Sequence, residues 1–268
     1  MADKVSKSIL ITGASGGMGR AAVKLFAERG YRVFALDIKP CDMQKNVMPV
    51  IADVTDEQSV TEAFNKVFES TDSLYAILHF AGIYMLDSLC EMDSSTFRRI
   101  FDINLTGAFL INKAFLPLLK SGSRILITTS ELAPLDPLPF TGIYAITKSA
   151  LDKYAYSLAM ELQLLGINVS VLRAGAVKTQ MLGTSTAALD KFCKGTRLYS
   201  CNAKRFKKIV DNVEARHISA EKIARKAYKI LALRKAKFAY SINRNPLLLL
   251  MNLLPKRLQL WVIKAILH

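Results

Sequence analysis

Residues 8–19 read SILITGASGGMG, a short apolar strand that runs into a glycine-rich loop and then into a helix. The glycines allow a tight turn and a close approach of the backbone to a ligand. Free N–H groups at the start of the following helix suit a pyrophosphate. A glycine-rich run alone is weak evidence, but its position between the first strand and the first helix indicates a dinucleotide site. The loop residues that we expect to contact the dinucleotide are Gly13, Ser15, Gly16, Gly17, Met18 and Gly19.

Beyond this loop, short apolar runs alternate with segments of helical period. The predicted strands are 8–14, 31–37, 47–54, 73–82, 124–130, 167–175 and 237–241. The predicted helices are 18–29, 56–69, 93–102, 104–119, 144–165 and 219–233, with an irregular stretch before the last one, to about 218. Strands that are apolar nearly throughout are expected where helices cover both faces of a parallel sheet. The pattern therefore predicts an α/β fold, a doubly wound Rossmann fold with a seven-stranded parallel sheet and helices on both faces.

The composition is that of a folded domain. The chain has 268 residues, of which 51% are hydrophobic and 22% are charged, so it is too apolar for disorder. It contains no linker, repeat or low-complexity tract. We expect one domain over residues 1–268, with a basic, apolar C-terminal segment from about 242.

Cysteine usage and the N-terminus indicate a reducing compartment. The four cysteines are scattered without a CxxC pair, and the N-terminus lacks the apolar core of a signal peptide. We expect a cytoplasmic protein. Neither the cysteines nor the three dispersed histidines have the spacing of metal ligands, so no metal site is expected.

An acid closes the second predicted strand. Asp37 lies 18 residues after Gly19, the last glycine of the loop. An acid about 20 residues after such a loop can bind the adenosine 2′-OH. A carboxylate there would repel a 2′-phosphate, which favours NAD(H) over NADP(H). Lys39 lies close enough to weaken this discrimination, and the alternative is that Asp37 is a turn acid before Pro40.

A tyrosine and a lysine lie four residues apart in GIYAITKSA, residues 142–150. At this spacing Tyr144 and Lys148 share one face of a helix. A free phenol titrates near 10, and a cation one turn away stabilises the phenolate and lowers that pKa. Tyr154 and Tyr156 on the same predicted helix have Leu158 and Met160 at the i+4 position, so Tyr144 is the candidate acid/base.

The TGxxxGxG loop, Ser130 after the fifth strand and the Tyr-x-x-x-Lys pair together resemble the short-chain dehydrogenase/reductase family, of hydroxysteroid or retinol dehydrogenase type, over roughly residues 7–241. The resemblance implies an enzyme that transfers hydride between a nicotinamide cofactor and an alcohol or ketone. It implies that Ser130 bonds the substrate oxygen, that Tyr144 is the acid/base and that Lys148 also contacts the nicotinamide ribose. Asn104, in DINLTGAF, matches an asparagine that holds a water linking the lysine to solvent.

Further matches concern the cofactor. Asp53 and Val54 resemble the pair beside adenine, and Val177 and Thr179 resemble residues that contact the nicotinamide. Ala81 and Gly82 end the family's Asn-Asn-Ala-Gly motif, whose asparagines are here His79 and Phe80. The usual Pro-Gly after the sixth strand is here Ala174-Gly175. We expect His79 to be a strand histidine near the cofactor rather than a catalytic group.

The segments expected to line a substrate site are apolar. They contribute Tyr84, Met85, Leu86, Leu132, Leu135, Leu138, Phe140, Met181, Leu182, Leu189, Phe192, Leu198, Tyr199 and Phe206. This lining favours a bulky apolar alcohol or ketone, such as a hydroxysteroid, bile acid or retinoid. The alternatives are NADP(H)-dependent reduction of a 3-oxoacyl thioester or another carbonyl and, more distantly, a non-catalytic dinucleotide sensor.

The charge is concentrated at the C-terminal end. Residues 191–268 contain 19 Lys and Arg but 3 Asp and Glu, whereas the first 190 residues are nearly neutral. Three interpretations of this basic part are open. It is a solvated basic face, it attaches the protein to anionic lipid through the leucines and tryptophan of 245–267, or it attracts an anionic substrate. Nucleic acid is not expected as a partner, because no recognition motif accompanies the charge. The family resemblance implies a homo-oligomer, a dimer or a tetramer.

Overall fold

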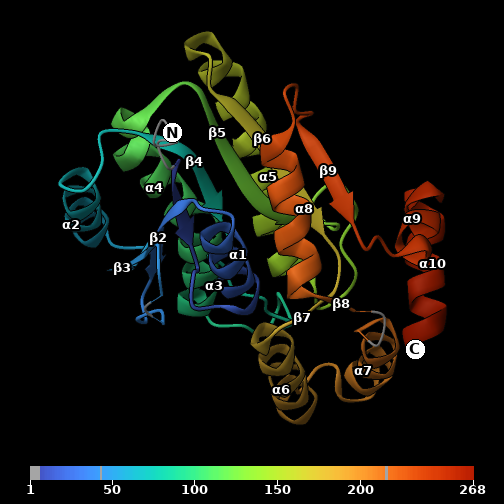
Figure 1. The fold of residues 1–268 in the computed structure, drawn as a ribbon. Coiled ribbons are helices and arrows are strands. Elements are labelled where there is room, and N and C mark those ends of the chain that lie inside the picture. The colour runs from blue at the N-terminus through green and yellow to red at the C-terminus, as the bar shows by residue number, and fades with distance from the viewer. Residues whose placement is uncertain (1–6, 43, 215–216) are drawn as a thin grey trace.

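The computed structural model describes residues 7–42, 44–214 and 217–268, with the side chains of 180–186 and 212–214 outside the description. Seven strands form one sheet in the order β3-β2-β1-β4-β5-β6-β9 (Figure 1). Their bounds are β1 (Ser8–Thr12), β2 (Arg32–Asp37), β3 (Val47–Ile51), β4 (Leu74–His79), β5 (Leu119–Ser130), β6 (Asn168–Ala174) and β9 (Ala239–Ile242). Every neighbouring pair is parallel, so the predicted doubly wound fold is confirmed.

Helices cover both faces of the sheet, which is why its strands are apolar nearly throughout. The flanking helices are α1 (Gly17–Glu28), α2 (Glu57–Phe68), α4 (Gly107–Phe115), α5 (Gly142–Leu162) and α8 (Ala220–Ala232). Ile9 and Ile11 of β1 pack in the cluster formed with α1 and α8. Leu10, between them, packs in the cluster formed with α2, α4 and α5. Successive side chains of a strand point to opposite faces, so β1 needs apolar residues at every position.

Helix α3 (Ser94–Phe101) continues into α4 through one π-helical turn, Asp102–Thr106. The predicted break between two helices at residue 103 is therefore wrong, because the backbone stays helical through the turn. A π turn adds one residue to a helix and is frequent at functional sites. Here it carries Asn104. After a short 3₁₀ turn, Leu116–Leu118, strand β5 begins at Leu119, earlier than the sequence pattern predicted.

The predicted irregular stretch after β6 contains two helices, α6 (Gln180–Gly195) and α7 (Ser200–Glu214). A short ladder of β7 (Val177–Lys178) and β8 (Ile218–Ser219) closes the segment at its base. The helices form because Leu189, Phe192 and Phe206 bury a separate apolar cluster against Leu86 and Leu267. This stabilising partner comes from distant parts of the chain, so a local pattern did not reveal it.

The C-terminal segment forms two helices, α9 (Pro246–Leu253) and α10 (Lys256–Leu267), which lie beside β9 at the right of Figure 1. Pro246 occupies the first turn of α9, where a missing N–H costs nothing. Pro255 caps the start of α10 and separates the two helices. None of the helices within the described ranges has the length and apolar character needed to cross a membrane.

Candidate active site

Two adjoining hollows lie where the sheet strands end at their carboxyl termini, the usual ligand position in open α/β sheets. The first, which we call the glycine cleft, is lined by the glycine loop, Asp37, Asp53 and Val54 and has a volume of about 660 Å³. The second, which we call the tyrosine pocket, is lined by Ser130, Tyr144 and Lys148 and has a volume of about 180 Å³. Met18, Gly82 and Thr179 line both, so the hollows are continuous.

The glycine loop lies so close to its neighbours that side chains cannot be added. A Cβ on Gly13, whose φ is +66°, would lie 2.5 Å from the Ala81 nitrogen. A Cβ on Gly19 would lie 2.0 Å from the Gly13 oxygen, and one on Gly17 would lie 2.7 Å from the Thr179 side chain. The bare backbone of this loop forms one wall of the cleft, as the sequence predicted for a phosphate-binding loop.

Asp37 lies in the cleft and already holds the backbone around it. Its carboxylate accepts the Ser15 N–H at 2.9 Å and the Lys39 N–H at 3.1 Å. The Ser15 hydroxyl donates in turn to the Lys39 carbonyl at 2.9 Å. These bonds tie the glycine loop to the end of β2, where Asp37 lines the cleft, and its binding of a ribose hydroxyl stays a prediction.

The other predicted cofactor residues also line the hollows. Asp53 accepts the N–H and hydroxyl of Thr55, while Val54 packs so tightly on Gly107 that a Cβ there would lie 2.7 Å from it. Ala81 donates its N–H to the Thr12 hydroxyl at 3.3 Å. Val177 is buried in the wall of the tyrosine pocket. The structure thus brings together every predicted cofactor residue except Ser15, whose contacts fix Asp37 instead.

Tyr144 lies near the start of α5 and lines the tyrosine pocket together with Ser130, which ends β5. The Tyr84 ring packs edge-on against it, with ring centroids 4.6 Å apart. Burial raises the pKa of Tyr144 to about 12. The nearby Glu131 charge also raises this pKa, and the Ser130 hydroxyl acts in the opposite direction. The sequence prediction of a lowered tyrosine pKa is therefore wrong for this state, because the cost of burying a phenolate is larger than its stabilisation.

Lys148 is buried one helical turn farther along α5. Its Nζ lies 5.7 Å from the Tyr144 ring centroid and donates to the Thr128 carbonyl at 3.3 Å. Burial lowers the pKa of Lys148 to about 8. The Thr128 hydroxyl beside it is the one buried side-chain polar atom of the described residues without a hydrogen-bond partner. The pocket thus presents an unsatisfied hydroxyl next to a buried amine, which suits a polar ligand group.

Asn104, on the π turn, holds the backbone that follows β4. Its amide accepts the Ile83 N–H at 2.8 Å and donates to the Ile83 carbonyl and the Thr147 hydroxyl, both at 3.0 Å. Gly82 separates it from Lys148, and a Cβ there would lie 3.1 Å from Asn104 Oδ1 and 3.4 Å from Lys148 Nζ. No direct bond joins Asn104 to Lys148 among the described residues, and its role toward a linking water stays a prediction.

His79 is buried at the end of β4, away from the reacting groups. Its Nε2 shares a 2.9 Å hydrogen bond with Asn112 Oδ1, and Asn112 Nδ2 donates to the Tyr154 hydroxyl at 3.1 Å. Burial lowers the pKa of His79 to about 4, so its ring is neutral at physiological pH. It ends β4 as the expected strand histidine, but it lines neither hollow, so the expected position near the cofactor is not supported.

Only some of the apolar residues predicted to line a substrate site do so. Tyr84, Leu132, Leu138 and Phe206 line the tyrosine pocket. Met85 and Leu135 line neither hollow, and Leu198 is exposed. The others belong to the cluster beneath α6 and α7, which also includes Tyr84, Leu138 and Phe206; they are Leu86, Phe140, Leu189, Phe192 and Tyr199. The side chains of Met181 and Leu182 lie outside the described residues.

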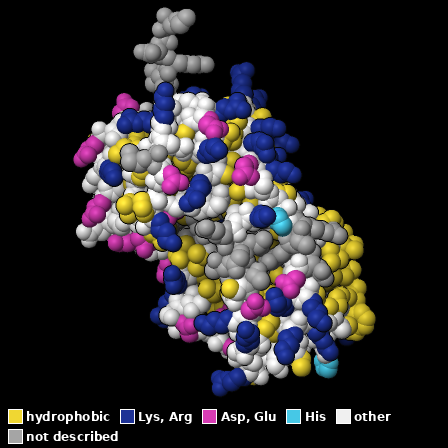
Figure 2. Space-filling view, turned by 60° about the horizontal axis from the view of Figure 1, so that its bottom comes forward, with side chains coloured by type: hydrophobic (Ala, Val, Ile, Leu, Met, Phe, Trp, Pro, Cys, Tyr) yellow, Lys and Arg dark blue, Asp and Glu magenta, His cyan; other side chains and the backbone are white. Residues whose placement is uncertain are grey.

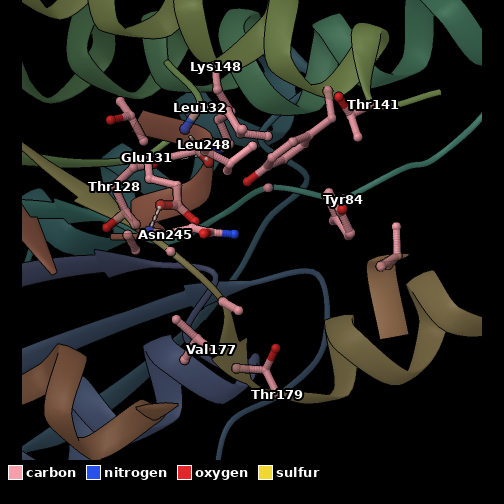
Figure 3. Close-up of a pocket in the computed structure, with 18 of the residues that line it drawn as sticks. Tyr84, Thr128, Glu131, Leu132, Thr141, Lys148, Val177, Thr179, Asn245 and Leu248 are labelled. Atoms are coloured by element: carbon pink, nitrogen blue, oxygen red, sulfur yellow. Dashed lines mark hydrogen bonds between the residues drawn. The ribbon is translucent and has the colours of Figure 1, made fainter. Parts of the chain in front are cut away.

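Sequence reasoning missed a carboxylate in the pocket. Glu131 Oε2 accepts the Asn245 N–H at 2.6 Å, and the two residues lie side by side in Figure 3. Burial raises the pKa of Glu131, opposed by this hydrogen bond and by the Arg244 charge. Leu248 of α9 completes the wall next to them. The position of Glu131 directly after Ser130 could have indicated it, whereas the contribution of α9 has no local signal.

The chain was compared with known proteins. A family model described as short chain dehydrogenase matches residues 7–190. The mouse protein estradiol 17-beta-dehydrogenase 2 is 31% identical over 192 residues, 66% of this chain and 50% of that protein. The chain thus spans about half the length of this relative. The uncharacterized oxidoreductase YbbO of Escherichia coli K12 is 33% identical over 182 residues, 66% of this chain and 68% of that protein.

Solved structures share the fold. A short chain dehydrogenase family protein from Francisella tularensis superposes with a TM-score of 0.73 at 23% identity, over 89% of this chain and 97% of that one. At this identity the likeness is one of architecture alone. The parallel sheet with helices on both faces is thus the fold that the family match leads one to expect.

Proposed function

The chain belongs to the short chain dehydrogenase family, and from that premise we propose that it is an NAD(H)-dependent oxidoreductase that interconverts a secondary alcohol and a ketone. The proposed substrate is bulky and apolar, of hydroxysteroid, bile acid or retinoid type. The observation that carries the proposal is that Ser130, Tyr144 and Lys148 line one pocket. This pocket adjoins the glycine cleft, with which it shares Met18, Gly82 and Thr179.

The proposed chemistry requires these side chains to hold a substrate oxygen and to move a proton. Ser130 and Tyr144 bind the oxygen, and Tyr144 donates its proton to the developing alkoxide during reduction. A phenol with a pKa of about 12 is protonated at neutral pH, which suits this direction. The buried amine of Lys148, with a pKa of about 8, supplies a cation next to the phenol as the proton leaves.

The residues of the glycine cleft fit a dinucleotide. The spaces beside Gly13 and Gly17 leave no room for a Cβ, and Asp37 points a carboxylate into the cleft. In the proposal the loop holds the pyrophosphate, Asp37 the ribose hydroxyls, Asp53 and Val54 the adenine, and Val177 and Thr179 the nicotinamide. When bound, the dinucleotide supplies the hydride. Because Asp37 would repel a 2′-phosphate, we propose NAD(H) over NADP(H).

The substrate class rests on the apolar wall of the tyrosine pocket. Leu132, Leu138, Phe206 and Leu248 contribute to it. The pocket volume of about 180 Å³ is below the roughly 300–1,000 Å³ of most ligand sites, so a steroid-sized substrate requires the α7 or α9 wall to move.

The partners and compartment are part of the same proposal. We propose a homo-oligomer, a dimer or a tetramer, and the exposed Phe97, Phe109, Ile146 and Met160 on α3, α4 and α5 support a further apolar contact surface. All four cysteines are free, which suits the proposed cytoplasmic compartment.

A substrate panel with two matched variants tests this function. Steroid, bile acid and retinoid ketones or aldehydes are offered with NADH and NADPH, and cofactor oxidation is followed. Tyr144→Phe is expected to lower kcat by about 10²–10⁴-fold while leaving NADH binding nearly unchanged. Tyr156→Phe, on the exposed side of the same helix, is the control and should keep full activity. Activity retained in Tyr144→Phe contradicts the mechanism, and NADH binding without turnover of any substrate supports the sensor alternative.

A further inference from the structure

Helices α9 and α10 carry an apolar surface that the rest of the described chain does not cover. A third of the large hydrophobic side chains exposed among the described residues lie on these two short helices. They are Leu247, Leu250, Leu253, Leu258, Leu260, Trp261 and Ile266. Leu253 is 80% exposed and Trp261 is 64% exposed. Figure 2 shows hydrophobic side chains gathered along the edge of the molecule that these helices form. An apolar patch of this kind marks an interaction surface.

The exposed leucines of α9 form one stripe. Leu247, Leu250 and Leu253 recur at three-residue intervals and therefore lie along one side of the helix. Leu248, on the other side, is buried and lines the tyrosine pocket. One helix thus separates the pocket from the exposed surface.

Polar contacts hold the inner side of the pair against the body of the protein. Asp136 donates its N–H to Asn252 Oδ1 at 2.6 Å, and Gln259 Nε2 donates to the Asp136 carboxylate at 3.2 Å. Lys256 pairs with the same carboxylate. The Leu267 carbonyl accepts hydrogen bonds from Asn202 and Arg205 of α7. The outward apolar side is therefore a surface of fixed orientation rather than a loose tail.

The charged residues of the two helices have one sign. Lys256, Arg257 and Lys264 lie on α10, and neither helix contains Asp or Glu. Arg257 and Lys264 are exposed on α10, among the exposed apolar residues. Leucines, a tryptophan and basic side chains on one helical surface are the composition of helices that lie in a lipid interface. The basic residues would attract anionic headgroups while the leucines enter the acyl boundary.

We propose that the outward surface of α9 and α10 docks on an anionic lipid bilayer. The basic side chains argue against a second copy as the occupant, because a symmetric contact would place like charges together. Docking brings the wall of Leu248 and Asn245 close to the lipid. If the proposed function holds, a lipid-dissolved substrate then reaches the tyrosine pocket from the bilayer side. The docking itself does not depend on that function.

The single tryptophan of the chain provides a direct probe, since it lies on the proposed surface. The full-length protein is mixed with vesicles of phosphatidylcholine and phosphatidylglycerol, or of phosphatidylcholine alone, at low and high salt. We expect the Trp261 emission to shift to the blue and the protein to co-sediment with anionic vesicles at low salt. We expect weaker binding to neutral vesicles and at high salt.

Two double variants separate the apolar from the basic contribution. Leu250→Ser with Leu253→Ser keeps the tryptophan, and we expect it to bind about tenfold less tightly or worse. Arg257→Gln with Lys264→Gln should lose about tenfold in affinity for anionic vesicles. The matched controls change the same residue types elsewhere on the surface. They are Leu164→Ser with Leu165→Ser and Arg234→Gln with Lys235→Gln, and both should bind as the natural chain does.

Three results would overturn the proposal. The first is the absence of both a fluorescence shift and co-sedimentation with anionic vesicles at low salt. The second is equal binding by the Leu250→Ser, Leu253→Ser variant and its control. The third combines two observations. Sedimentation velocity without vesicles shows an oligomer that dissociates in the Leu250→Ser, Leu253→Ser variant and not in its control, and the natural chain does not bind vesicles. Circular dichroism and NADH binding check that each variant folds. A protein that binds vesicles but turns over no substrate would reject the proposed function and leave the docking proposal intact.

Discussion

Asp152 of α5 holds the Arg173 guanidinium of β6 in a two-point ion pair, with Oδ1 3.0 Å from Nε and Oδ2 2.6 Å from a terminal nitrogen. The Thr129 hydroxyl donates to the same carboxylate at 3.2 Å. Asp152 follows Lys148 by one helical turn, and Thr129 precedes Ser130. The pair therefore fixes α5 against β5 and β6 directly behind the proposed catalytic residues.

Asp152→Asn is expected to destabilise the protein by about 1–3 kcal/mol, because it leaves a largely buried guanidinium without its charge partner. Denaturant unfolding measures the loss. Glu57→Gln, which removes a partner from the exposed Lys113 pair, is the control and should cost much less stability than Asp152→Asn. Equal losses in the two variants would show that the buried pair has no special role.

Asp37→Ala is expected to raise the relative use of NADPH, because the carboxylate that would repel a 2′-phosphate is removed. The ratio of kcat/KM for NADPH to that for NADH measures the change. Asp42→Ala, a nearby acid outside the glycine cleft, serves as the control. An unchanged ratio in Asp37→Ala would refute the cofactor preference. Since Asp37 also holds the Ser15 N–H, the melting temperature is measured in parallel.

Lys148 should make stability depend on alkaline pH. Its pKa is lowered from 10.5 to about 8 in the folded state, so the unfolded chain binds more protons between these values. Stability must then rise with pH across that range, by up to about 3 kcal/mol. Tyr144, with its pKa raised to about 12, acts in the opposite direction above pH 10.

The measurement is the difference in unfolding free energy between the natural chain and Lys148→Met at several pH values from 8 to 10. We expect the natural chain to gain stability relative to the variant as the pH rises. A difference that stays constant would mean that Lys148 is not desolvated in the folded protein.

His79 should make stability depend on acidic pH. Its pKa is lowered from 6.5 to about 4 on folding, so the unfolded chain binds the extra proton in this range. The stability that the neutral ring contributes is complete above pH 6.5 and declines toward pH 4, by up to about 3 kcal/mol. His79→Asn keeps a hydrogen-bonding group beside Asn112 and removes the titration. Relative to this variant, the natural chain should lose stability on acidification, and parallel pH curves would contradict the assignment.

The order of the secondary structure could be predicted because each sheet strand is buried on both faces and is therefore apolar throughout. The glycine loop and the Tyr144–Lys148 pair could be located for a similar reason, since both depend on spacing over a few residues. Helices α6 and α7 could not be predicted, because Leu86 and Leu267, which bury their apolar sides, come from distant segments of the chain. The continuous α3–α4 helix also escaped prediction, because a π turn leaves no clear sequence signal.

The sequence by itself determined the fold class, the position of the glycine loop and which tyrosine of α5 is followed by a lysine four residues later. Only the tertiary structure decided the electrostatics and the walls of the site. Burial raises the pKa of Tyr144 and lowers that of Lys148, whose amine donates to the Thr128 carbonyl. Glu131 meets Asn245 across 114 residues of chain. Desolvation and contacts of this kind depend on which distant segments pack together. Helical spacing and strand burial, in contrast, follow from the order of neighbouring residues in the sequence.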